Sequence, residues 1–326
     1  MKGNAIRWWR SFAVAGVWLL GSAAQAQADY PTRTVQVVVA YPAGGGTDTL
    51  ARIVTAELSK ALGQSFVVVN RPGASGLIGT TAVARAAPDG YTLLLDTGNA
   101  TLRPAIEPST PFKPKDFAPV ALLTESPVAL AVAESLPVSS LPELVAYSKA
   151  NPGKLNYAST GPGSPQNLVT ELMKTKLGLD WQEVPYQGGG PALTDLAAGR
   201  VQLMFSNPVP LMPYANTRRL KVLAVTSRDR LPALDAIPTM EQAGVADFQI
   251  GFWNGLLAPA GTPPSVLARL SEAALKVMRL PAVREALIQQ GSVLMPLDQA
   301  HFARYMAEDS ARWERVGKLI QYKPVQ

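Results

Sequence analysis

Short apolar runs alternate with amphipathic stretches along most of the chain. The run Val35–Ala40 predicts a buried strand, and residues 47–62 predict a helix because Leu50, Val54 and Leu58 recur at helical spacing. Further strands are predicted at residues 66–69, 91–95, 155–158, 184–186, 201–205, 220–226 and 255–258, and further helices after Ser140 and at residues 165–177, 191–198, 263–280, 283–290 and 298–319. This alternation is typical of an α/β protein with βαβ units and a largely parallel sheet.

The alternation forms two series, which are followed by a helical return. The second series begins after Pro137, and crossings between the series are expected near residues 128–133 and 249–256. We therefore predict two lobes, each long enough to bury its own core. One lobe comprises residues 29–128 plus 252–326, and the other comprises residues 129–251.

The first 28 residues have the pattern of an export signal. Three basic residues precede an apolar run at residues 12–20, and A-x-A cleavage patterns end at Ala26 and Ala28. The apolar run is shorter than the ~20 residues that a membrane span needs. We predict a signal peptide over residues 1–28, cleaved near Ala26 or Ala28, and a soluble exported protein; the family resemblance described below implies the periplasm as its location.

The composition argues against several classes of function. The chain has one histidine, His301, and no cysteine, so a Ser-His-Asp or Cys-His centre would depend on that single residue. Zinc ligation of the usual kind is excluded, as are a disulfide scaffold and a cysteine-linked lipid anchor. Phosphate-loop and nucleophile-elbow motifs do not occur, and no cofactor is predicted.

The charge does not indicate a nucleic-acid partner. The formal net charge of the full chain is +6, but three of the basic residues belong to the predicted signal peptide. The longest basic cluster is Arg218-Arg219-x-Lys221, which is too short for a nucleic-acid stripe.

Three glycine-rich turns, at residues 41–48, 159–167 and 186–191, each follow a predicted strand and open a predicted helix. In a parallel sheet such turns lie at the edge where ligands bind. The N–H groups that open a helix have no intrahelical partner and can bind an anion. Taken alone, the first turn is equally well explained as an ordinary turn in which Thr47 or Asp48 caps the helix. Three such turns in two lobes favour a cleft.

Such a cleft can hold a carboxylate without an arginine. A hydrogen bond to a charged group contributes ~1.5–3 kcal/mol and a helix terminus ~0.3–1 kcal/mol. Four or five such contacts leave micromolar binding, ~8 kcal/mol, after the cost of association.

Nine segments in order resemble the tripartite tricarboxylate transporter solute receptors, the Bug family of periplasmic binding proteins. The segments lie at residues 41–52, 69–74, 87–91, 115–120, 150–159, 184–186, 191–196, 223–227 and 255–263. The resemblance extends from Tyr30 to about Trp313. It implies a two-lobed type II periplasmic-binding fold that closes on a small carboxylate, such as a di- or tricarboxylate or an aromatic acid. It also implies membrane transporter subunits as partners, and we expect the protein to be a monomer.

The resemblance also implies which residues line the cleft. One wall is expected to contain Gly44, Gly45, Thr47 and Asp48, and the other Ser159, Thr160, Gly163 and Ser164. The same turns and two stretches that follow strands add further candidates: Tyr41, Ala43, Thr97, Asn99, Asn167, Tyr186, Gly188, Ser206 and Asn207.

Departures from the family pattern bear on the ligand. Ser206-Asn207 replaces a common Asp-Asn pair, and Asn167 replaces a common histidine, so a plain carboxylate is favoured over an amino acid. Arg103 could reach a distal carboxylate, although a solvated loop position is the favoured interpretation. Trp253 could stack on an aromatic acid or belong to the core, and the sequence does not decide between them.

Two other functions share this fold or this cleft. A ligand-loaded sensor that docks on a membrane signalling receptor would have the same fold and differ only in its partner. An enzyme could use the same cleft, but one histidine and no cysteine argue against it.

Overall fold

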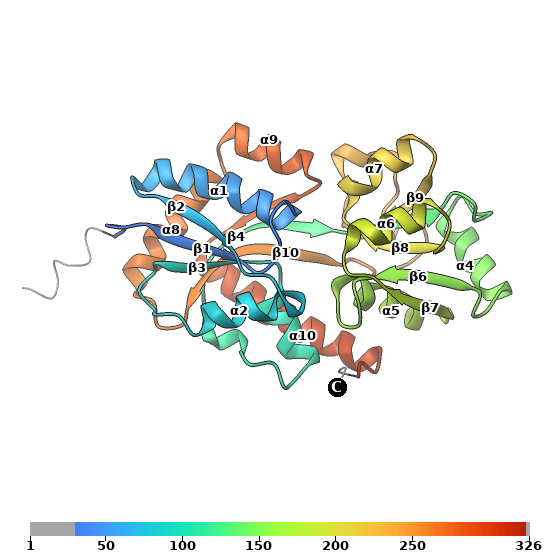
Figure 1. Cartoon of the computed structure of the whole chain (residues 1–326), viewed down its shortest axis with the longest axis horizontal. Coiled ribbons are helices and arrows are strands. Elements are labelled where there is room, and N and C mark those ends of the chain that lie inside the picture. The colour runs from blue at the N-terminus through green and yellow to red at the C-terminus, as the bar shows by residue number, and fades with distance from the viewer. Residues whose placement is uncertain (1–29, 324–326) are drawn as a thin grey trace, which may run out of the picture.

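The computed structural model describes residues 30–323, and the predicted signal peptide lies outside them. The described chain forms two α/β halves that lie side by side, and the chain crosses between them along long strands (Figure 1). Within residues 30–323, no helix combines the length and the apolar character that a bilayer span requires.

The first half contains a six-stranded sheet with the order β11-β4-β10-β3-β1-β2. Its strands are β1 (Val35–Val39), β2 (Phe66–Asn70), β3 (Thr92–Asp96), β4 (Phe117–Pro127), β10 (Gly251–Pro259) and β11 (Val293–Leu297). Its helices are α1 (Gly46–Leu62), α2 (Leu77–Ala84), α3 (Asn99–Ile106), α8 (Pro264–Val277), α9 (Pro281–Gln289) and α10 (Gln299–Leu319), with short 3-10 turns η1 (Ala74–Gly76) and η2 (Pro114–Asp116).

The second half contains a five-stranded sheet with the order β7-β6-β8-β5-β9. Its strands are β5 (Ala129–Ala133), β6 (Leu155–Ser159), β7 (Trp181–Pro185), β8 (Leu203–Ser206) and β9 (Leu220–Val225). Its helices are α4 (Leu141–Ala150), α5 (Pro165–Leu177), α6 (Gly189–Ala197) and α7 (Pro208–Asn216), with the 3-10 turn η3 (Pro232–Leu234). The exact lobe boundaries at residues 128 and 252 stay predictions.

The expectation of a largely parallel sheet is wrong, because each sheet is mixed. Strands β1, β2 and β3 run parallel in one sheet, and β6, β7 and β8 run parallel in the other. The strands at the crossings enter antiparallel: β4 and β10 pair with each other, and β5 pairs with β8 and β9. A chain that leaves one half and later returns to it must run in opposite directions along the two crossing strands.

Several helix ends follow from the local sequence as predicted. Gly63 and Gly178 end α1 and α5 in the left-handed conformation, which costs glycine little. The Ser140 side chain accepts the N–H of Glu143 and caps α4. The alternative interpretation, in which Thr47 or Asp48 caps α1, is wrong: the helix begins at Gly46, and its N-cap is Gly45.

Some elements were not predicted because their sequences carry weak or opposing signals. Helices α3 and α7 contain prolines within them, Pro104 and Pro213, and an internal proline argues against a helix. Strand β5 is Ala-Leu-Ala-Val-Ala, which is poor in the β-branched residues that mark strands. The short helix α2, strand β4 and strand β11 were also not predicted.

The apolar cores connect the two halves. Trp313 of α10, from the first half, is 2 % exposed and lies in the cluster that also contains Tyr157, Trp181 and Phe205 of the second half. Its ring stacks on Phe252 with centroids 5.7 Å apart and planes 17° apart. Helix α10 therefore packs across the junction, and its end lies near α5 (Figure 1).

Candidate ligand-binding site

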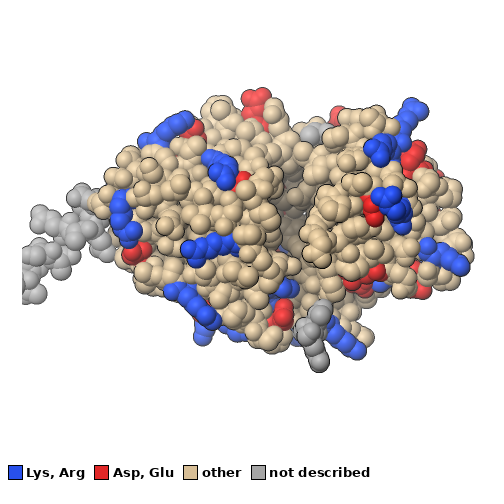
Figure 2. Space-filling model, viewed as in Figure 1, with Lys and Arg blue, Asp and Glu red and all other residues tan. Residues whose placement is uncertain are grey.

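The turns that follow the parallel strands of both sheets face one another across a groove between the halves. Figure 2 shows this groove, with the charged side chains of this face lying mostly on the outer surfaces of the two halves. A Cβ built on Gly46, at the start of α1, would lie 3.9 Å from Nδ2 of Asn207 in the second half. A Cβ built on Gly163 would lie 3.0 Å from Nη1 of Arg103 in the first half. The turns are therefore two walls of one cleft.

Hydrogen bonds to the Asp48 carboxylate stabilise the turn between β1 and α1. Its carboxylate accepts the backbone N–H of Gly44 at 2.9 Å, two N–H groups of Arg52 at 2.9 and 3.1 Å, and the amide of Asn70 at 2.9 Å. Asn70 also donates to the carbonyl of Tyr41 at 3.1 Å. These bonds, led by the one to Arg52, hold the pKa of Asp48 down to about 2 although burial opposes them. Asp48 is 3 % exposed and shapes the turn.

Tyr41, Thr97 and Asn99 form a polar group at the ends of β1 and β3. The Tyr41 hydroxyl accepts the Thr97 hydroxyl and the Asn99 amide, each at 3.0 Å. Its own hydrogen therefore has no acceptor among the described residues. Burial raises the pKa of Tyr41, so the phenol stays neutral and can donate a hydrogen bond to an anion.

Gly76 brings backbone close to this polar group. A Cβ built on it would lie 2.3 Å from the Asn99 amide nitrogen and 3.3 Å from the Tyr41 hydroxyl. The backbone before it is left-handed at Ala74 and Ser75, with φ of 47° and 52°. Such a conformation costs a non-glycine residue free energy and is found most often at functional sites.

In the second half, a buried network fixes the turn between β6 and α5. The Ser159 hydroxyl donates to Glu183 at 2.5 Å and accepts the N–H of Gly161 at 2.8 Å. Asn167 donates to Glu183 at 2.9 Å, and its carbonyl oxygen accepts the N–H of Gly163 at 3.0 Å. Both side chains are buried. They set the shape of the wall rather than forming its exposed surface.

Donors remain free on both walls of the cleft. No side chain caps α1, α6 or α7, whose first residues follow the turns. Helix α5, in contrast, is capped by Ser164, which accepts the N–H of Asn167. Uncapped first turns present N–H groups and the positive end of the helix dipole. Within residues 30–323 no cluster of His, Cys, Asp and Glu could hold a metal ion.

The sequence that forms this site matches a known family of receptors. Residues 50–322 match the model described as tripartite tricarboxylate transporter family receptor. The chain belongs to this receptor family. Protein BugT of Bordetella pertussis is 36 % identical over 313 residues, which cover 94 % of this chain and 96 % of BugT.

Solved structures of the receptor family share the fold. R. palustris Rpa4515 with adipate has a TM-score of 0.83 and 35 % identity, covering 91 % of this chain and 100 % of that one. MatC from Rhodopseudomonas palustris with bound malate has a TM-score of 0.79 and 36 % identity, covering 88 % and 100 %. The periplasmic binding protein BugD has a TM-score of 0.81 and 31 % identity, covering 90 % and 99 %. The predicted family and two-lobed fold are thereby confirmed.

The predicted site residues lie at the turns of the receptor and differ in their exposure to solvent. Exposed are Ala43, Gly44, Gly45 and Asn207; partly exposed are Tyr41, Thr47, Thr97, Thr160, Tyr186, Gly188 and Ser206; buried are Asp48, Asn99, Ser159, Gly163, Ser164 and Asn167. The Tyr186 hydroxyl donates to Asp195 at 2.9 Å, and the Thr160 hydroxyl donates to Gln166 at 3.2 Å. Whether these residues contact ligand stays a prediction.

Sequence reasoning did not find the supporting residues Asn70, Gly76 and Glu183. Asn70 lies within the segment 69–74 that carried the family resemblance, and Gly76 lies two residues after it, so that segment was the available signal. Glu183 is a charged residue inside a strand, at a position where a solvent-facing side chain is the usual expectation. The bonds that Ser159 and Asn167 make to Glu183 form only when β6, α5 and β7 meet.

Two residues whose roles were open can now be placed. Trp253 is fully buried, and its indole N–H donates to Asp309 at 2.9 Å; it belongs to the core. Arg103 lies on α3 with 12 % of its side chain exposed, so the solvated loop position is wrong. His301 is exposed beside Asp298, the N-cap of α10.

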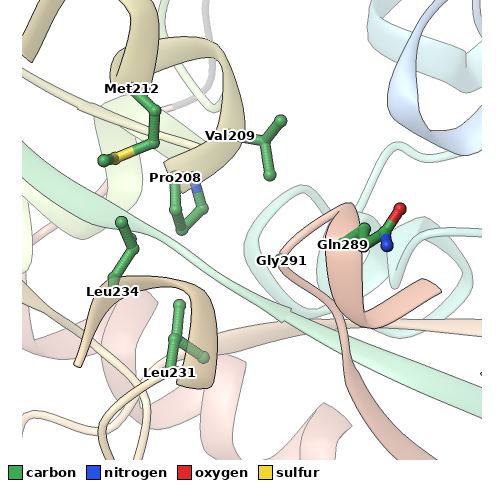
Figure 3. A pocket seen from close by; sticks show the side chains of 7 residues that line it. All are labelled: Pro208, Val209, Met212, Leu231, Leu234, Gln289 and Gly291. Atoms are coloured by element: carbon green, nitrogen blue, oxygen red, sulfur yellow. The ribbon is translucent and has the colours of Figure 1, made fainter. Parts of the chain in front are cut away.

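An apolar pocket lies between α7 and η3 of the second half and the end of α9 of the first half (Figure 3). Its lining comes from α7, the segment around η3, and the turn after α9: Pro208, Val209, Met212, Leu231, Leu234, Gln289 and Gly291. The lining has no charged side chain, and the pocket does not include the glycine-rich turns.

Proposed function

We propose that this protein is a periplasmic receptor that captures a small carboxylate in the cleft and delivers it to the membrane subunits of a tripartite tricarboxylate-type transporter. It acts as a monomer and leaves the ligand chemically unchanged. Export requires the predicted signal peptide, and residues 29–128 plus 252–326 and residues 129–251 act as the two lobes. The family match favours the transporter over the sensor that the sequence left open.

The observation that carries the proposal is the set of free donors on both walls. The uncapped starts of α1 and α6, the Thr47 hydroxyl and the free hydrogen of Tyr41 all belong to the turns around one groove. Each can bond a carboxylate oxygen, and burial of the ligand between the halves strengthens these bonds. Rpa4515 with adipate and MatC with malate indicate the ligand class.

The test is a thermal-shift screen of residues 29–326 against aliphatic di- and tricarboxylates, aromatic acids and acidic amino acids. A ligand at 100 times its Kd stabilises the fold by ~2.7 kcal/mol, which corresponds to a shift of a few degrees for a chain of this size. Hits are then titrated by calorimetry, and the recovered ligand is checked for chemical change. A flat screen, with protein free of retained ligand, would contradict the carboxylate proposal.

A matched pair of variants tests the position of the cleft. Thr47 and Thr49 lie on the first turn of α1; Thr47 is partly exposed, and the Thr49 hydroxyl bonds back to the carbonyl of Gly45 at 3.1 Å. Thr47→Ala should weaken carboxylate binding roughly tenfold, because it removes a hydrogen bond to a charged group. Thr49→Ala should leave Kd unchanged. Equal effects of the two variants would place the ligand elsewhere.

A further inference from the structure

Arg103 is a buried cation with almost no partner in the part of the chain that the structure describes. Its side chain is 12 % exposed, and its nearest carboxylate, Glu107, lies 3.5 Å from Nη1. That distance is longer than an ordinary charge-assisted hydrogen bond. The Nε atom is buried and has no hydrogen-bond partner among residues 30–323. A guanidinium has five N–H donors, so most of its capacity is unused.

Two other arginines show how guanidiniums in this protein pair with carboxylates. Arg52 makes two hydrogen bonds to the carboxylate of Asp48 although its side chain is 55 % exposed. Arg312 also has a buried Nε without a partner among the described residues, but its Nη2 donates to the buried carboxylate of Asp309 and to the carbonyl of Gly251. Burying a charge is costly unless it is paired and hydrogen-bonded. Arg103 is buried more deeply than Arg52 or Arg312 and is paired less well.

The guanidinium of Arg103 lies between the two halves. Its Nη1 would be 3.0 Å from a Cβ built on Gly163, which lies in the turn between β6 and α5. The amide of Asn99 donates to the Tyr41 hydroxyl. Arg103 lies four residues after Asn99 on α3. Four residues of helix place the two on the same face, about 6 Å apart along the axis. The cation therefore lies one helical turn beyond the polar group that ends β1 and β3.

We propose that Arg103 binds the second carboxylate of a linear dicarboxylate whose first carboxylate is held near Tyr41 and the start of α1. The inference rests on the proposed function and narrows its ligand class. A second carboxylate provides the acceptors that Arg103 lacks, in the two-pronged geometry that a guanidinium favours. A monocarboxylate of the same length leaves the buried cation unpaired, so it is bound more weakly.

The experiment compares acids that differ only in the second carboxylate. Kd is measured by calorimetry for adipate against hexanoate and for succinate against butyrate. The wild-type protein should bind the better dicarboxylate at least about tenfold more tightly than its monocarboxylate partner. Arg103→Gln should weaken dicarboxylate binding about 10- to 100-fold and change monocarboxylate binding less than threefold. Arg103→Lys should recover only part of the loss, because an ammonium group lacks the planar fork.

Two control variants separate a ligand contact from other effects. Arg33→Gln makes the same change of charge on the outer surface, where Arg33 pairs with Asp89 and is 62 % exposed. It should leave every Kd unchanged. Glu107→Gln removes the weak competitor for the Arg103 guanidinium, so dicarboxylate binding should tighten. Thermal unfolding without ligand shows that each variant is folded.

Three results would overturn the inference. If Arg103→Gln weakens the binding of both acids of a pair equally, Arg103 stabilises the arrangement of the two halves and does not contact the second carboxylate. If the wild-type protein binds hexanoate as well as adipate and butyrate as well as succinate, the cation is not used, and the proposed function stands without it. If no carboxylate binds, the proposed function fails together with the inference.

Discussion

Several polar residues near the cleft act by holding the backbone that surrounds it. Asp48 is the clearest example, because its carboxylate joins the turn at Gly44 to Arg52 of α1 and Asn70 of β2. Ser159 does the same in the second half through Glu183 and Gly161. Substitution of either residue should therefore affect stability as well as binding, whereas Thr47→Ala should affect binding alone.

The Asp48 network gives a prediction that depends on pH. The pKa of Asp48 is lowered from 3.8 to about 2 in the folded protein. A depressed acid stabilises the fold above its unfolded pKa, and this contribution is lost as the pH falls toward about 2. Asp48→Asn should therefore lower the free energy of unfolding by roughly 1–2 kcal/mol at pH 7. This value is smaller than the full pKa shift implies, because solvent screens the exposed Arg52 guanidinium.

Urea denaturation at a series of pH values measures this effect. The gap between wild type and Asp48→Asn should narrow as the pH falls below about 4, because Asp48 becomes protonated. Glu57→Gln is the control, since Glu57 only pairs with the exposed Lys60 on the same helix. It should change stability by less than about 0.5 kcal/mol. A constant gap at all pH values would show that Asp48 acts through shape alone.

At the scale of the helix, the helices that begin at the cleft differ in how their first turns are capped. Ser164 caps α5 with a hydrogen bond of 3.3 Å to the N–H of Asn167, while α1 and α6 have no side-chain cap. An uncapped helix sacrifices about 1 kcal/mol of stability. The open N–H groups can donate hydrogen bonds to a ligand, so we expect a bound carboxylate to supply the missing caps.

Two serines in matched positions test this division. Ser140 caps α4 away from the cleft, with 3.4 Å between its hydroxyl and the N–H of Glu143. Ser140→Ala and Ser164→Ala should each lower the free energy of unfolding by about 1 kcal/mol. Only Ser164→Ala should also weaken carboxylate binding, because Ser164 lies in the turn that forms one wall. Calorimetric titration of both variants measures their affinities for the carboxylate. An equal loss of affinity in the two variants would contradict a role for Ser164 in the cleft.

At the scale of the whole molecule, α10 ties the two halves together on one side of the cleft. Trp313 enters the apolar core of the second half, and Asp309, on the same helix, accepts hydrogen bonds from Thr101 of α3 and Trp253 of β10. The halves are therefore joined by packing as well as by the crossing strands. We expect them to unfold together.

Replacing Trp313 should uncouple the halves. Trp313→Ala removes a buried ring at the junction and should cost roughly 3–5 kcal/mol. Scanning calorimetry should show one transition for the wild type and a split or broadened transition for this variant. Trp181→Ala is the comparison, because Trp181 is equally buried but lies within the second half. A single sharp transition for both variants would mean that the strands alone couple the halves.

The sequence by itself determined the elements with strong local signals, the family, and the turns that surround the cleft. Gly63, Gly178 and Ser140 act at helix ends as their chemistry requires, because capping depends on neighbours in the chain. The lack of a thiol and the scarcity of histidine are likewise properties of composition alone.

Only the tertiary structure decided what each side chain at those turns does. Asp48 and Asn167 lie behind the turns because their partners come from Asn70 and Glu183, on strands distant in the sequence. The direction of the crossing strands depends on how the chain returns to the first half. Trp253 is a core residue that bonds to residues of α3 and α10, and Arg103 is a buried cation whose guanidinium lies beside the Gly163 turn of the second half. Burial and partners arise from contacts between remote segments, which no local pattern contains.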